Sequence, residues 1–463
     1  MRVNARAAAW MLVLLAGTAT GASALTTAGE RELGQQFDLE ARKRVALVDD
    51  PDVVAYVNEL GGRIVAQLQQ PHFAYQFAVV RDARMNAFAV PGGYVYVHSG
   101  LLATAQSEDE IAGVLGHEIA HVHAHHLARQ QERTQLLNYA VLAGTLLSII
   151  QPAAGALASA AGQTVALQYK REFEQEADYL GARYMRAAGY DPRALLDFFK
   201  RLSDQQRNAP TSVPAYAQTH PLTDERLNQL EAVLNTQQWA ARERAPVSLA
   251  LQRVRALVRV RGEPASDVQA AYARERDARP NDPMAAYLVG LVDLETGRVD
   301  DAERALLAAR EGGVQDADRE LGRLALRRRD AARARELLTA HLDKKPADAA
   351  ALIELATADE ALGDRHGALS AYRRALDLAP GLAAAHISYG RLAGRLGRDG
   401  EGFYHLATAS RLEGNCEGAL RQYTRAEPLL PAGDARREDA AEWITTLRAY
   451  LGLPERADPS EEP

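Results

Sequence analysis

The sequence predicts a mainly helical protein in two parts: an α+β region with a small sheet, followed by an α-solenoid of repeats. Three observations support this fold class. Amphipathic helical stretches open the 463-residue chain. A short run rich in apolar and β-branched residues surrounds a Pro-Gly-Gly turn. The last third of the chain repeats itself with a helical period.

Composition places the chain among globular proteins, with 47% hydrophobic and 25% charged residues. The net charge of −7 is mild, so we expect no nucleic-acid partner. Cys416 stands alone, which excludes an internal disulfide and predicts a small buried side chain within a helix. We divide the chain into a signal peptide (1–24), a first domain (27–245) whose chemistry is considered below, a linker (246–264), a repeat domain (265–435), and a C-terminal helix with a disordered tail (436–463).

The N-terminus has the pattern of a secretory signal peptide. Arg2 and Arg6 are basic, residues 7–16 are largely apolar, and Ala22-Ser23-Ala24 fits a small-x-small cleavage site before Leu25. A membrane anchor is the alternative, but the apolar run is short for a span. No cysteine sits at the cleavage site itself, so a lipoprotein anchor is not indicated. We therefore expect export, to the periplasm or a membrane surface facing it.

Local patterns place the elements of the first region. Apolar spacing predicts the first two helices, β-branched runs predict three strands, and Pro91-Gly92-Gly93 joins the last two as a hairpin. The expected helices are 30–47, 51–69 and 107–129, and the expected strands are 75–80, 86–90 and 94–98.

Residues 134–169 carry no Asp, Glu, Lys or Arg. The stretch 136–150 is strongly apolar, and Pro152 ends it. One interpretation is a buried helical hairpin packed on the first region. The other is a helix pair that touches or enters a membrane, although the first run is short for a full span.

The second region repeats every 34 residues. Pro346 and Pro380 are separated by that interval, and so are Gly363 and Gly397. A helix-turn-helix unit of this length is typical of tetratricopeptide (TPR) repeats. One unit is degenerate, with Arg329-Asp330 in place of a Gly-Asp turn. Stacks of such units form surfaces that bind peptides or proteins.

The chemistry centres on His117-Glu118-Ile119-Ala120-His121, which reads H-E-x-x-H. On a helix the two histidines share a face and can hold one zinc ion. Glu118 then lies where a general base could take a proton from water. This pattern indicates a zinc metallopeptidase of the zincin type.

A third ligand is needed, and the best candidate lies downstream. Glu174 and Asp178 are four residues apart on an expected helix and share its face. Glu174 could complete a His-His-Glu site, and Asp178 could accept a hydrogen bond from a ligand histidine. The longer pattern H-E-x-x-H-x-x-G-x-x-H is absent. His123, His125 and His126 are expected beside the site or in solvent, because no Gly or Pro bends the helix there; their roles stay open.

Three stretches together resemble the zinc peptidase family that includes HtpX and the CAAX prenyl proteases. They are residues 86–93, the H-E-x-x-H motif, and Glu174-Gln175-Glu176-Ala177-Asp178 followed by residues 188–192. The resemblance implies one zinc per chain, held by His117, His121 and Glu174, with Glu118 as base and Asp178 supporting a ligand.

The resemblance also points to Thr219-His220-Pro221 and Arg226. It implies that His220 either reaches the zinc and keeps the enzyme latent or stabilises the oxyanion during turnover. It further implies that Asn86, Ala87 and Phe88 lie on an edge strand that pairs with extended substrate.

The function expected from this resemblance is zinc-dependent cleavage of misassembled outer-membrane proteins, with chaperone-like help from the repeats and contact with the β-barrel assembly machinery. Two alternatives stay open. One is a normally latent assembly adaptor; the other is a membrane-surface protease contacting lipid through 134–169.

Overall fold

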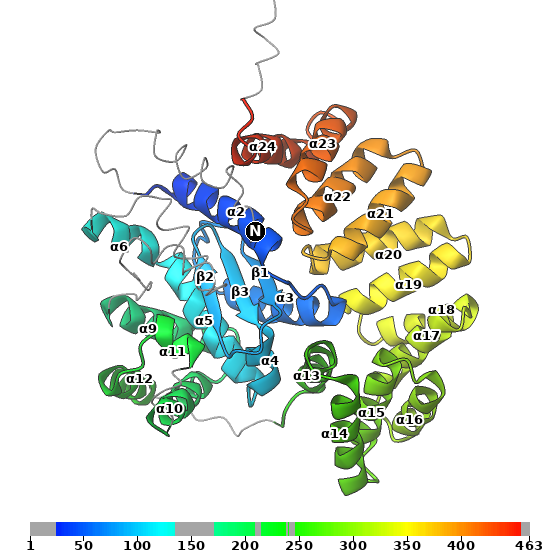
Figure 1. Cartoon of the computed structure of the whole chain (residues 1–463), viewed down its shortest axis with the longest axis horizontal. Coiled ribbons are helices and arrows are strands. Elements are labelled where there is room, and N and C mark those ends of the chain that lie inside the picture. The colour runs from blue at the N-terminus through cyan, green and yellow to red at the C-terminus, as the bar shows by residue number, and fades with distance from the viewer. Residues whose placement is uncertain (1–24, 135–170, 209–213, 238, 240–245, 455–463) are drawn as a thin grey trace, which may run out of the picture.

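The computed structural model describes residues 25–134, 171–208, 214–237, 239 and 246–454. Helices dominate, and one three-stranded sheet lies in the first part of the chain, as the predicted fold class requires (Figure 1). The expected signal peptide and almost all of the apolar segment 134–169 lie outside the described residues, so both remain predictions.

The first two helices begin at side-chain caps. Helix α2 (Thr27–Arg44) starts where the Thr26 side chain accepts a hydrogen bond from the Gly29 N–H. Helix α3 (Pro51–Val65) starts at Asp50, whose carboxylate accepts hydrogen bonds from the Asp52 and Val53 N–H groups. These bonds satisfy amide groups that have no partner inside the helix.

The sheet contains the predicted hairpin. Strands β2 (Ala87–Val90) and β3 (Tyr94–His98) pair antiparallel, and Gly92 and Gly93 between them adopt φ values of 83° and 96°. Strand β1 (Gln76–Val80) pairs parallel to β3, giving the order β1-β3-β2. Strand β2 therefore lies at an edge of the sheet.

Helix α4 (Ser99–Thr104) leads into α5 (Glu108–His123), which carries the H-E-x-x-H motif. The predicted single helix 107–129 is in fact interrupted. The chain bends at Ala124 and His125, where His125 adopts a φ of 53°, before α6 (His126–Thr134). The expectation that a bend here would need Gly or Pro was wrong, because a histidine takes the left-handed conformation, which non-glycine residues adopt only occasionally.

Helix α9 (Arg171–Ala187) packs directly against α5. A Cβ on Gly181 would lie 2.9 Å from the His117 backbone nitrogen, and one on Gly116 would lie 3.1 Å from the Gly181 oxygen. The absence of side chains at these two positions lets the helices approach closely. Three further helices complete this region: α10 (Arg193–Asn208), α11 (Ala215–Thr219) and α12 (Asp224–Thr236).

The second part is a series of antiparallel helix pairs. Gly297, Gly363, Gly397 and Gly414 adopt left-handed φ values at the turns, as the repeat spacing predicts, and Arg329 does so in the degenerate unit, at 63°. The helices are α13 (Leu249–Gly262), α14 (Ala265–Ala278), α15 (Pro283–Glu295), α16 (Val299–Glu311), α17 (Ala317–Arg327), α18 (Ala331–Leu342), α19 (Ala349–Ala361), α20 (Arg365–Leu378), α21 (Ala383–Arg395), α22 (Asp399–Leu412), α23 (Cys416–Ala426), the 3₁₀ helix η2 (Glu427–Leu429) and α24 (Ala435–Tyr450).

The repeats form an arc beside the first region, with α3 pointing toward the middle of the arc (Figure 1). Residues 246–264, expected to be a linker, contain α13, which packs on α3, α4 and α15. At the far end, α2 contacts α24, where the Gln35 side-chain amide donates to Glu442 over 3.0 Å. The two parts are therefore joined at several points.

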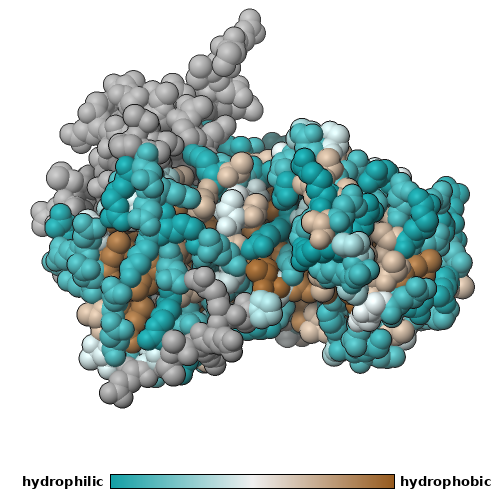
Figure 2. All heavy atoms as spheres, turned by 90° about the horizontal axis from the view of Figure 1, so that it is seen from below, coloured by the Kyte–Doolittle hydropathy of each residue, from teal (hydrophilic) through white to brown (hydrophobic). Residues whose placement is uncertain are grey.

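On the face drawn in Figure 2, the coloured surface is mostly hydrophilic, and apolar side chains show mainly between helices. Leu251, Val254 and Leu257 on one face of α13 are buried, as is Cys416 at the start of α23. Among the described residues, no helix combines the length and apolar character needed to span a bilayer.

Candidate metal centre

Helix α5 places His117 and His121 on one face and buries both completely or nearly so. The helix begins at Ser107, whose hydroxyl accepts a hydrogen bond from the Glu110 N–H. The Nε2 atoms of His117 and His121 lie 3.0 Å apart. Two ring nitrogens that converge in this way suit a shared cation better than a hydrogen bond between the rings.

Helix α9 brings the two predicted carboxylates to the same place. Glu174 Oε2 lies 3.5 Å from His117 Nε2, and Glu174 Oε1 lies 3.4 Å from His121 Nε2. The close approach allowed by Gly116 and Gly181 sets these distances. The sequence alone did not show this proximity, because Glu174 comes 53 positions after His121 along the chain.

His220 joins the group from the end of α11. Its Nδ1 lies 3.0 Å from Glu174 Oε1 and 3.3 Å from His117 Nε2. One ligand atom from each of these four residues lies within 4.8 Å of the others, and all four side chains are buried. The structure therefore assembles a compact group of three imidazoles and one carboxylate.

Asp178 and Arg226 support this group through the ring nitrogen of His117 that faces away from the other ligand atoms. Asp178 Oδ1 lies 2.9 Å from His117 Nδ1, on the far side of the ring from the converging atoms. Arg226 donates to both oxygens of Asp178, over 2.6 and 2.7 Å, and also pairs with Glu174. Burial raises the pKa of Glu174, but the charges of Arg226 and His220 and the hydrogen bonds from His117 and His121 together outweigh it. They keep that pKa well below its usual value.

Glu118 lies beside the group and is buried with it. Burial raises the pKa of its carboxyl to about 7, and Glu174 adds to the shift. The backbone N–H of Ala89 and the charge of His220 oppose it. His220 Nε2 lies 3.3 Å from Glu118 Oε1, so His220 contacts both Glu118 and Glu174. A carboxyl with this pKa can accept and return a proton near neutral pH.

Tyr216 is a residue of this site that the sequence did not reveal. Its ring stacks on His220 with centroids 4.6 Å apart and on Phe199 at 6.0 Å. The side chain is fully buried, and the hydroxyl interacts with Glu118 closely enough to lower the pKa of that carboxyl. Its position four residues before His220, one helical turn, was the available signal.

The remaining histidines of the motif helix separate into two environments. Because of the bend, His126 Nδ1 lies 2.9 Å from His121 Nδ1, behind a candidate ligand. His125 instead pairs with Glu30 of α2 over 2.5 Å, and His123 packs on Tyr184. None of the three belongs to the compact group of four ligand atoms.

The expected substrate strand lies next to the site. Asn86, directly before β2, and Ala87 and Phe88 at its start are all buried. Strand β2 is an edge of the sheet, and it packs on α5. The Ala89 N–H reaches Glu118 from the same strand. That substrate pairs along this strand stays a prediction.

The donor set fits a divalent metal ion. Neutral imidazoles and a carboxylate are ligands that zinc accepts, and a catalytic zinc site needs three protein ligands with one further position. The far nitrogen of His117 faces a carboxylate, an arrangement that fixes ring orientation in metal-binding histidines. The residues present therefore suit a metal held by His117, His121 and Glu174.

Comparison with known proteins agrees with this geometry. Residues 51–234 match Peptidase family M48. This region is an M48 peptidase domain. The match contains every member of the buried group and both residues behind it.

Relatives extend the likeness. The beta-barrel assembly-enhancing protease of Yersinia pestis is 36% identical over 221 residues, covering 46% of this chain and 45% of that protein. A Vibrio cholerae protein of the same description is 36% identical over 307 residues, covering 63% of this chain and 61% of that protein. The mitochondrial metalloendopeptidase OMA1 of Schizosaccharomyces pombe is 33% identical over 177 residues, covering 38% and 51%. The chain thus spans about half to three-fifths of these relatives.

Solved structures of MamA overlap with 33 to 36% of the chain at 18 to 21% identity. For the 41-end form from Desulfovibrio magneticus RS-1, which is covered to 96%, the TM-score is 0.30. A likeness at that TM-score is too loose to inform function.

Proposed function

We propose that this M48 domain is a zinc-dependent endopeptidase. The observation that carries the proposal is the buried convergence of His117, His121 and Glu174, with a carboxyl of pKa about 7 beside it at Glu118. One zinc ion per chain would be held by those three residues. When bound, zinc would polarise the scissile carbonyl and acidify water.

The chain's own residues perform the proton transfers. Glu118 takes the proton of the attacking water and gives it to the leaving amine, which its pKa near neutrality permits. Asp178 fixes the ring of His117, and Arg226 in turn fixes Asp178. Strand β2 offers an edge along which an extended peptide would pair, so that many sequences could be accepted.

His220 is the residue we propose to control activity. Its Nδ1 belongs to the ligand group, and its Nε2 faces the general base. In this arrangement His220 would occupy the position that water or substrate needs, and the enzyme would be latent. After displacement, the same imidazole would be close enough to stabilise a developing oxyanion.

For the substrate we propose misassembled outer-membrane proteins of the periplasm, with chaperone-like help from the repeats. The support is the name of the relatives, beta-barrel assembly-enhancing protease, together with the repeat arc that lies beside the peptidase domain. The repeats would provide contact with the β-barrel assembly machinery. Export by the expected signal peptide 1–24 belongs to the same proposal.

The test is degradation of casein and of an unfolded β-barrel protein by the purified mature chain. Wild type, Glu118→Gln and His220→Ala are compared with their zinc content measured. Cleavage by wild type that Glu118→Gln abolishes, with zinc retained, supports the endopeptidase. If all three variants bind zinc and none cleaves either substrate, the proposal fails.

A second candidate is an assembly adaptor that is normally latent. The contact of His220 with the ligand group favours it. An adaptor predicts that wild type is silent, that His220→Ala cleaves, and that Glu118→Gln still supports β-barrel assembly in cells. Loss of assembly in Glu118→Gln would instead show that proteolysis is the main task.

A further inference from the structure

The start of helix α3 lies against the inner side of the repeat arc. Helix α3 belongs to the peptidase domain, where it packs on α5 and β1, yet it also contacts α13, α19 and α20. Its first residues, Pro51 to Ala55, make these repeat contacts through two kinds of side chain. Asp52 is acidic and Val54 is aliphatic.

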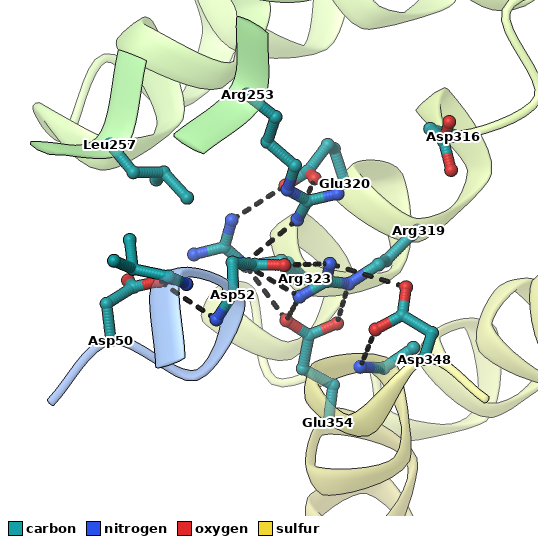
Figure 3. A network of polar contacts seen from close by, with 12 residues as sticks. Asp50, Asp52, Arg253, Leu257, Asp316, Arg319, Glu320, Arg323, Asp348 and Glu354 are labelled. Carbon is teal, nitrogen blue, oxygen red and sulfur yellow. Dashed lines mark hydrogen bonds and ion pairs between the residues drawn. The ribbon is translucent and has the colours of Figure 1, made fainter. Parts of the chain in front are cut away.

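Asp52 meets two arginines from different helices (Figure 3). Arg319 of α17 donates to Asp52 through both terminal nitrogens, one of them over 3.0 Å. Arg253 of α13 donates to the same carboxylate over 3.1 Å. The two arginine side chains are 1% and 8% exposed. Two buried guanidinium groups that converge on one carboxylate form a specific carboxylate site.

Val54 fills an apolar position next to this site. It is 5% exposed and belongs to the same hydrophobic cluster as Leu352, Leu376 and Leu382 of the repeats. Its neighbour Val53 belongs instead to the cluster that holds the core of the peptidase domain and continues into α13 and α15. The first turn of α3 therefore presents an acid and, two residues later, an aliphatic side chain to the repeats.

The arginines do not depend on Asp52 alone. Arg319 also pairs with both oxygens of Glu354, over 2.9 and 3.0 Å, and Arg253 pairs with Glu320 over 2.6 Å. Asp348 lies 3.5 Å from Arg319 as well, so withdrawal of Asp52 leaves each guanidinium with an acidic partner. The large cost of stranding a buried charge does not arise, so this contact is suited to exchange.

We infer that the inner face of the repeats is a docking site for an acidic-aliphatic peptide segment, and that Asp52 and Val54 of α3 occupy it as an internal ligand. The partner that fits is an extended or helix-starting segment with Asp two residues before an aliphatic side chain. Such a partner would compete with the peptidase domain for the repeats. Partner binding would then displace the start of α3 from the repeats. Because α3 also packs on the motif helix α5, the two events would be coupled.

The experiment uses the mature chain and a labelled peptide copying residues 48–56, with binding followed by fluorescence anisotropy. In wild type α3 occupies the site, so the measured affinity is the intrinsic affinity multiplied by the fraction of molecules in which the site is open. Asp52→Asn should bind the peptide about tenfold more tightly than wild type. Glu59→Gln, on the exposed side of α3 and paired with Arg63, is the matched control and should behave as wild type.

Two further arms make the result specific. In the first arm, the peptide itself carries Asp52→Asn and should no longer bind the Asp52→Asn chain. In the second arm, the chain carries both Asp52→Asn and Arg253→Gln and should no longer bind the unaltered peptide. If Asp52→Asn does not fold, Val54→Ala, which keeps the ion pairs, gives the same comparison. Equal binding by wild type and the variant, or no binding by either, would overturn the inference. The readout needs no peptidase activity, so it stands apart from the proposed function.

Discussion

Asp178 Oδ1 lies 2.9 Å from Nδ1 of His117, on the opposite side of the imidazole from the atoms that converge with His121 and Glu174. This contact fixes which nitrogen of His117 faces the candidate metal. Arg226 holds the same carboxylate through two hydrogen bonds, so its position is set by helix α12 as well as α9.

Asp178→Asn should weaken metal binding by about 10- to 100-fold, because the supporting group loses its charge while its shape is kept. Competition with a chelator of known affinity measures the change. Glu172→Gln, exposed on the same helix, is the control and should bind metal as wild type does. Unchanged affinity in Asp178→Asn would show that this carboxylate serves only the fold.

Substitutions at Tyr216 separate its ring from its hydroxyl. Tyr216→Phe keeps the stacking on His220 and should retain bound metal while lowering kcat about tenfold or more, with little change in KM. Tyr216→Leu also removes the stacking and should lower metal affinity. Steady-state cleavage of a peptide together with metal titration tests both. Wild-type kcat in Tyr216→Phe would remove the hydroxyl from the chemistry.

The approach of α5 and α9 depends on Gly181. In Gly181→Ala the new Cβ meets backbone atoms of α5 at 2.9 and 3.0 Å, so the helices must separate. We expect a loss of about 1–3 kcal/mol in the free energy of unfolding and weaker metal binding. Urea unfolding measures the first effect. Gly62→Ala, on α3 with no atom within 4 Å of the new Cβ, should instead stabilise by about 0.5–1 kcal/mol.

Stability should depend on pH through Glu354. Burial raises the pKa of this carboxyl from 4.5 to about 7 in the folded chain. Between those values the folded state holds a proton that the unfolded state has released. Its contribution is therefore present at low pH and is lost as pH rises from about 4.5 to about 7.

Between pH 5 and pH 8, the free energy of unfolding of wild type should accordingly fall by up to about 2 kcal/mol relative to that of Glu354→Gln. The comparison is made by urea unfolding of both chains at each pH. Because every other titrating group is shared, the difference between the chains isolates Glu354. A difference that does not vary with pH would contradict the prediction.

Several elements were predictable because their signals are local. The hairpin around Gly92 and Gly93 and the left-handed turns at Gly363 and Gly397 depend on residues within a few positions. The bend at His125 was missed because its conformation is set by contact with Glu30 of α2 rather than by Gly or Pro. The helix in the expected linker was missed in the same way, since α13 is stabilised by packing on α3, α4 and α15.

The sequence by itself determined which side chains could bind a metal and how they are spaced along the chain. A helix repeats about every 3.6 residues, so the spacing of His117 to His121 and of Glu174 to Asp178 places each pair on one face. Only the tertiary structure decided that these faces meet, because the approach depends on two glycines on different helices. It also decided that Tyr216 and His220 close over the site, and that Asp52 lies between arginines more than 200 residues away in the chain. Contacts of that range depend on how helices pack, and packing has no short-range signature in sequence.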